Sequence, residues 1–75
     1  MPRTDLIARL ASDLARLPYA YHSLSDVDAM VSRLATDPAW VYGELMDDAR
    51  VHEDCDNWIK ADVVRQTAAR VVALM

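Results

Sequence analysis

Residues 5–17 read DLIARLASDLARL and repeat with the period of an α-helix. Four leucines recur at intervals of four, four and three residues, which places them on one helix face: Leu6, Leu10, Leu14 and Leu17. Aspartates and arginines occupy the opposite face. Thr4 stands where a side chain can cap the first turn, and Pro18 disfavours helical geometry at the residue before it. These signals predict an amphipathic helix over residues 5–17.

Local capping signals predict two further helices. Residues 18–22 show no period and indicate a short linker. Either Ser23 or Ser25 caps a helix over residues 24–35, since each serine is followed three residues later by an acid, as in a capping box. Asp37 is a favourable N-cap and the proline after it suits the first helical position, so a third helix is expected over residues 38–53.

The segment Asp54 to Asn57 is rich in side chains that hydrogen-bond to their own backbone and so interrupt helices. It predicts a break followed by a fourth helix over residues 58–74. One long bent helix from Pro38 onward is the alternative, because neither Pro nor Gly occurs after position 43. No segment alternates with period two, so we expect an all-α fold: a small bundle of about four helices forming a single domain over residues 1–75.

The apolar positions of these helices predict the core. Leu24 begins the apolar face of the second helix. The fourth helix is expected to bury one face made of Ile59, Val63, Val64, Thr67, Ala68, Val71, Val72 and Met75. Trp40 and Trp58 are predicted to meet at one end of the bundle. Together with Tyr42 they are candidates for the core, and also for an interface, where aromatic residues are enriched.

Composition excludes several classes of protein. The chain has 75 residues, a net charge of −4 and one cysteine, which leaves no room for a large enzyme with a cofactor domain and allows no internal disulfide. An acidic balance argues against a direct nucleic-acid binder. No apolar run approaches the ~20 residues of a membrane span, and residues 1–5 lack the apolar core of a signal peptide, so a cytoplasmic protein is predicted.

The acidic excess is concentrated in one quarter of the chain. Residues 44–62 hold seven acids and two bases, whereas residues 1–43 hold five acids and four bases, and residues 63–75 hold two bases. A solvated helix face is one interpretation of this segment. The other is a surface that docks on a basic partner, with six candidate partner-binding residues: Glu44, Asp47, Asp48, Glu53, Asp54 and Asp56.

Catalytic and metal-binding chemistry have weaker support. His52, Cys55 and Asp56 offer three ligand types within one helical turn, but the second histidine of a zinc protease motif is missing. His22 lies beside Ser23 and Ser25, yet nothing else in so small a chain supplies the remainder of a hydrolase site. A helix-turn-helix would place an acidic recognition helix against phosphates. No catalytic residue and no cofactor is therefore predicted.

The sequence favours a non-enzymatic protein-binding module that docks its acidic segment on a basic surface, such as the nucleic-acid groove of another protein. Small inhibitors such as anti-CRISPR proteins and antitoxins have this size and charge, and the likeness extends no further. One alternative is a structural subunit that forms a homodimer through apolar helix faces, since 28 residues other than alanine are apolar. A metal-binding protein that uses His52, Cys55 and Asp56 is the more remote alternative.

Overall fold

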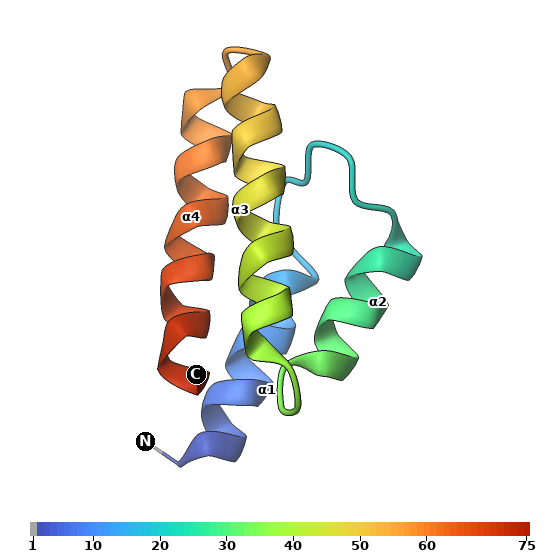
Figure 1. The fold of residues 1–75 in the computed structure, drawn as a ribbon, viewed down its shortest axis with the longest axis vertical. Helices are drawn as coiled ribbons and strands as arrows, with labels where there is room; N and C mark the ends of the chain where they lie inside the picture. The colour runs from blue at the N-terminus through green and yellow to red at the C-terminus, as the bar shows by residue number, and fades with distance from the viewer. Residues whose placement is uncertain (1) are drawn as a thin grey trace.

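The computed structural model describes residues 2–75, and Figure 1 shows their arrangement. The helices are α1 (Arg3–Leu14), α2 (Leu24–Arg33), α3 (Pro38–Asp54) and α4 (Trp58–Val71), followed by the short 3-10 helix η1 (Val72–Leu74). The longest elements, α3 and α4, lie side by side as an antiparallel hairpin, while α1 passes behind them and α2 flanks α3. The predicted all-α bundle of four helices is confirmed.

The N-termini of α2 and α3 form where the capping residues predict. Ser23 accepts a hydrogen bond from the Asp26 amide and the Asp26 carboxylate accepts one from the Ser23 amide, which completes a capping box. Asp37 accepts from the Trp40 amide and Pro38 takes the first helical position. The predicted break is also confirmed: Asp56, with φ 60°, turns the chain between α3 and α4.

The bounds of α1 differ from the prediction at both ends. The helix begins at Arg3, so Thr4 lies inside it and caps nothing. It ends at Leu14 rather than residue 17, because Pro18 has no amide hydrogen and its ring clashes with the carbonyl four residues earlier. That carbonyl belongs to Leu14, and the Tyr19 hydroxyl donates to it at 2.6 Å.

The core lies between the α3–α4 hairpin and the two shorter helices. Thirteen apolar residues are buried there: Leu10, Leu14, Val27, Met30, Leu34, Val41, Leu45, Ala49, Ala61, Val64, Ala68, Val71 and Leu74. Polar contacts join the ends of the bundle. The Arg3 guanidinium donates to the carbonyls of Ala35 and Leu74, so the start of α1 is bonded to the chain that follows α2 and to η1.

The predicted inward face of α4 is wrong in half of its members. Ile59 is 82% exposed, and Val63, Val72 and Met75 are also exposed. The buried face instead contains Ala61, Val64, Thr67, Ala68 and Val71. Alanines at this face allow α4 to approach α3 closely, and so the small residues are selected for the interface while the bulkier Ile59 is left outside. Leu24, predicted to belong to the core, is 85% exposed at the first position of α2.

The two tryptophans do not meet. Trp40 lies in the first turn of α3 and Trp58 begins α4, so the antiparallel hairpin places them at opposite ends. Trp40 packs half-buried on the core with the Arg33 guanidinium carbon 4.4 Å from its ring centroid, a cation–π contact. Gly43 is exposed in the middle of α3, and no atom lies close enough to require a glycine there.

Candidate functional site

The connection between α1 and α2 crosses to α3 and bonds to it through polar groups. We call this connection, residues 15–23, the strap. Asp48 of α3 has no exposed surface and accepts hydrogen bonds from the strap amides of Ala20, at 2.9 and 3.1 Å to its two oxygens, and Tyr21, at 3.3 Å. A helix side chain thus satisfies backbone donors of a segment that has no secondary structure of its own.

His22 is the side chain that completes this attachment. Its Nδ1 lies 2.7 Å from Asp48 Oδ2 and its Nε2 lies 2.9 Å from Glu44 Oε2. The ring stacks on Tyr21 at 4.2 Å between centroids and meets the edge of Tyr19 at 5.6 Å. Burial lowers the pKa of His22, but the hydrogen bonds and charges of Glu44 and Asp48 outweigh burial, so the pKa lies above its ordinary value of 6.5.

A second histidine supports the same cluster from α3. His52 is buried, and its Nε2 donates to the Pro18 carbonyl of the strap and lies 3.6 Å from Asp48 Oδ1. Within residues 2–75, every buried side-chain nitrogen and oxygen has a hydrogen-bond partner. We call His22, Glu44, Asp48 and His52 the polar cluster. All of its buried polar atoms have hydrogen-bond partners, as expected for polar groups taken out of water, and these bonds attach the strap to α3.

The structure divides the six predicted partner-binding acids into two groups. Glu44 and Asp48 bond to His22, and Glu53 forms an ion pair with Arg65 of α4. The burial of Asp48 withholds it from any partner, which corrects its assignment to a docking surface. Asp47, Asp54 and Asp56 remain exposed. The side chain of Asp47 is 59% exposed, and its contact with Arg50 at 3.7 Å is a weak surface pair.

Three acids of α3 lie along one line of the helix surface. Glu44, Asp47 and Asp54 are separated by three and seven residues, spacings that keep side chains on one helix face, with about 10 Å between the last two along the axis. We call them the acidic stripe. Tyr21 of the strap lies beside its Glu44 end, because the Tyr21 ring stacks on the His22 ring that bonds to Glu44. Burial and the charges of Glu44, Asp47, Asp48 and Asp26 raise the pKa of Tyr21.

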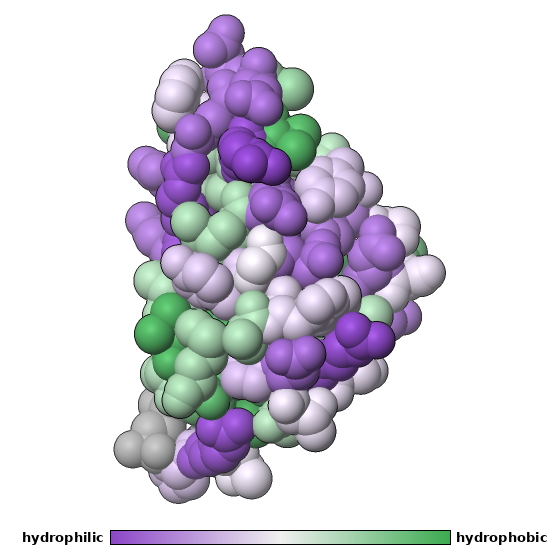
Figure 2. Space-filling model, viewed as in Figure 1, coloured by the Kyte–Doolittle hydropathy of each residue, from purple (hydrophilic) through white to green (hydrophobic). Residues whose placement is uncertain are grey.

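The charge of Asp26 acts in a different place from the one that its position in the sequence suggests. It belongs to α2 and was counted with the balanced residues 1–43, but the fold brings it close enough to raise the pKa of Tyr21. The Ser23 hydrogen bonds lower the pKa of Asp26 and keep it ionised. The negative charges near Tyr21 therefore come from two helices, α3 and α2. Figure 2 shows hydrophilic residues gathered over the upper part of the α3–α4 hairpin.

The candidate metal ligands do not converge. His52 points inward to the strap, whereas Cys55 and Asp56 are exposed in the turn after α3. Among residues 2–75, no three His, Cys, Asp or Glu side chains gather closely enough to hold a metal ion. His22 is likewise unavailable as a base for Ser23, because carboxylates occupy both of its ring nitrogens.

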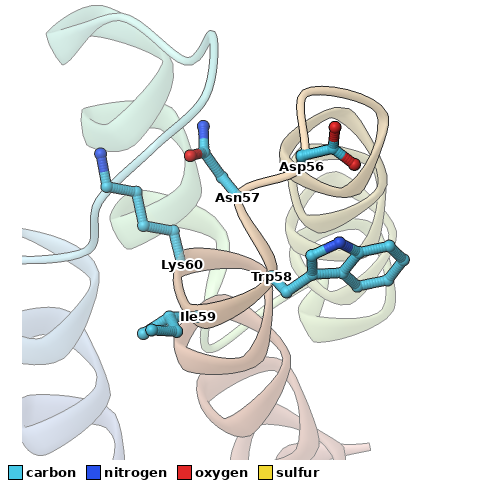
Figure 3. Close-up of a pocket in the computed structure, with 5 residues that line it drawn as sticks. All are labelled: Asp56, Asn57, Trp58, Ile59 and Lys60. Carbon is cyan, nitrogen blue, oxygen red and sulfur yellow. The ribbon is translucent and has the colours of Figure 1, made fainter.

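The surface of residues 2–75 includes two hollows of some size, and neither is an enclosed site. The larger, about 480 Å³, is lined by the consecutive residues Asp56 to Lys60 at the start of α4. Figure 3 shows Trp58 pointing to one side of α4 and Ile59 and Lys60 to the other, so these side chains do not surround a ligand. The second, about 280 Å³, lies between the strap and the start of α2, with Tyr19, His22 and Leu24 in its wall.

The candidate interface aromatics also differ in exposure. Trp58 is 58% exposed, whereas Trp40 and Tyr42 are half-buried and pack on the core. Only Trp58 therefore presents most of its surface to a partner. An apolar region visible in Figure 2 covers the lower end of α4. The large exposed apolar residues in that part of the chain are Val72 and Met75.

Within residues 2–75, none of the helices has the length and apolar character needed to cross a bilayer. A scan against protein-family models, a search of curated proteins and a search of solved structures each found no match.

Proposed function

We propose that this protein is a non-enzymatic binding module that docks its acidic stripe on a basic surface of a partner protein. The observation that supports the proposal is the exposure of Asp47 and Asp54 on one face of α3, with the exposed ring of Tyr21 near the Glu44 end of the stripe. Carboxylates in such a row attract a basic surface over several ångströms and accelerate its capture. A tyrosine at the edge adds an amphipathic contact of the kind common in interfaces.

A nucleic-acid groove on another protein is the basic surface that best matches this stripe. Such grooves are lined by Lys and Arg that would otherwise contact phosphates, and the acids of α3 carry the same sign of charge as phosphate. Occupying the groove would exclude nucleic acid. The proposed role is therefore that of a small inhibitor, in the manner of the anti-CRISPR proteins and antitoxins that share this size and charge.

Charge reversal tests the docking proposal. The variant Asp47→Lys/Asp54→Lys should capture the partner about tenfold more weakly than the wild type at low salt, because two favourable charge contacts become repulsive. The measurement is affinity capture from the source cells at low and high salt, followed by titration of the recovered partner in the presence of competing nucleic acid.

Asp5→Lys/Asp62→Lys is the matched control. It changes the net charge by the same amount at exposed positions outside α3. It should retain capture. Equal binding by the wild type and the stripe variant, or an equal loss in both variants, would show that the stripe is not the docking surface.

Self-association through α4 is the second candidate function. Ile59 and Val63 lie one helical turn apart on the outer side of α4 and are both exposed, which leaves large apolar side chains without a partner. A symmetric homodimer would cover them. Sedimentation equilibrium should then show a dimer that Ile59→Glu/Val63→Glu converts to a monomer. A wild-type protein that stays monomeric at high concentration removes this candidate.

A further inference from the structure

The geometry at His22 requires a charged ring. Each ring nitrogen lies within 3 Å of a carboxylate oxygen, Nδ1 beside Asp48 and Nε2 beside Glu44. An ionised carboxylate only accepts hydrogen bonds, so both nitrogens have to donate. Only the imidazolium form has a hydrogen on each nitrogen. A neutral ring would leave one of these two contacts without a proton.

The strap depends on the polar cluster for its attachment, and His22 is the member that the strap itself contributes. The strap contains no helix, and its polar bonds to α3 end on three cluster residues: Asp48, Glu44 and His52. The hollow beside it, about 280 Å³, shows that side chains do not fill the space between the strap and the start of α2. Hydrogen bonds and charge therefore provide a large share of what holds residues 20–22 in place.

We infer that His22 is a charge-dependent latch, which holds the strap on α3 while both ring nitrogens are protonated and releases it when one proton is lost. Glu44 and Asp48 are four residues apart on one helix face, a spacing at which two negative charges repel. The positive charge of the imidazolium between them offsets the repulsion between the two carboxylates. Once the ring is neutral, one carboxylate loses its bond to the ring and the repulsion opposes the closed arrangement.

The groups that face the ring come from α3, α2 and the strap. Those that carry a charge are all acidic. Glu44 and Asp48 face it from α3, and Asp26 interacts with it from the first turn of α2. Tyr19 and Tyr21 of the strap contact its faces without charge, since their pKa values are raised above the ordinary value. His52 lies on the far side of Asp48, with its Nε2 proton directed at the Pro18 carbonyl.

The direction of the pH dependence follows from these charges. The pKa of His22 is higher in the folded protein than the ordinary 6.5 of an unfolded chain. A group with a raised pKa stabilises the folded arrangement fully below pH 6.5, and this stabilisation is lost as the pH rises through the folded value. The latch is therefore closed at mildly acidic pH and opens on the alkaline side. Opening frees the strap that carries Tyr21 beside the acidic stripe.

Hydrogen exchange at the strap amides tests the latch. The amides of Ala20 and Tyr21, which bond to Asp48, should show constant protection below pH 6.5, lose up to about tenfold in protection per pH unit between pH 6.5 and the folded pKa of His22, and level off above it. Protection is measured relative to an unstructured peptide at each pH. The Leu45 amide, inside α3, should stay protected throughout, because the opening is local.

Two carboxamide variants separate the latch from a general charge effect. Glu44→Gln removes the negative charge that contacts Nε2, and the partly exposed position tolerates an amide of the same shape. It should lower the folded pKa of His22, so the loss of strap protection should level off at a lower pH and be smaller in total. Asp47→Asn removes an equal charge from the same helix without a bond to His22, and should leave the midpoint in place. Strap protection that does not depend on pH, equal shifts in both variants, or simultaneous loss at Leu45 would each overturn the latch.

Discussion

Asp48→Ala should lower the free energy of unfolding by about 3–5 kcal/mol, the usual cost of removing one partner from a buried charged network. The Asp48 carboxylate is fully buried and accepts from two strap amides and from His22. Alanine leaves two backbone donors without acceptors and leaves His22 with only Glu44. A 75-residue domain has roughly 4–11 kcal/mol of stability in total, so this loss should remove a large fraction of it and leave the variant unfolded or much less stable.

Urea unfolding followed by circular dichroism measures this loss. The neighbouring Asp47→Ala is the matched control, since it removes the same group from an exposed position on the same helix. It should change the stability by no more than about 0.5 kcal/mol. If the two variants lose equal stability, then Asp48 does not hold the strap.

Leu45→Ala should lower the free energy of unfolding by about 2–5 kcal/mol, because it leaves a cavity in the centre of the core. Leu45 has no exposed surface and lies on the face of α3 that packs into the bundle. The same substitution at Leu24 removes an 85% exposed side chain and should change the stability by less than about 0.5 kcal/mol.

The pair of leucines distinguishes the observed core from the one expected from the apolar pattern. Both residues are leucines of helices that the sequence predicts, and only the fold separates them. Thermal or urea unfolding of the two variants under identical conditions gives the comparison. A large loss at Leu24, or a negligible loss at Leu45, would show that α2 or α3 packs on a different face.

The parts of the fold that were predictable depend on local chemistry. Ser23 with Asp26, and Asp37 with Pro38, determine where α2 and α3 begin through bonds within four residues. The turn at Asp56 is likewise determined by residues close to it in the sequence. The end of α1 was missed because the effect of Pro18 reaches the carbonyl of Leu14, four residues earlier, and not only the residue before the proline.

The inward face of α4 was not predictable from its apolar residues alone. A stripe that includes Ile59 and Val63 is as regular as one that includes Ala61 and Ala68. Which stripe is buried depends on how closely α3 and α4 approach, and that distance is a property of the pair. Hydrophobicity favours the bulkier residues, whereas close packing of two helices favours the small ones.

The polar cluster was missed for a different reason. His22 is separated from Glu44 and Asp48 by 22 and 26 residues, so no local spacing joins them. Counting charge along the chain treats each acid as an outward group, whereas this fold turns Asp48 inward. One signal was present. His22 follows Tyr19 and Tyr21 and directly precedes the capping residue Ser23, in a linker too apolar to remain in solvent.

The central claim is that His22 bonds to Asp48 and Glu44 as an imidazolium and so holds the strap on α3. The most direct test is an NMR titration of the His22 ring nitrogens in the wild-type protein, with His52→Gln used to assign the two histidines. The account predicts that both nitrogens are protonated at pH 6.5 and that the midpoint lies above this value. A neutral ring with a single protonated nitrogen, or a midpoint at or below pH 6.5, would contradict it.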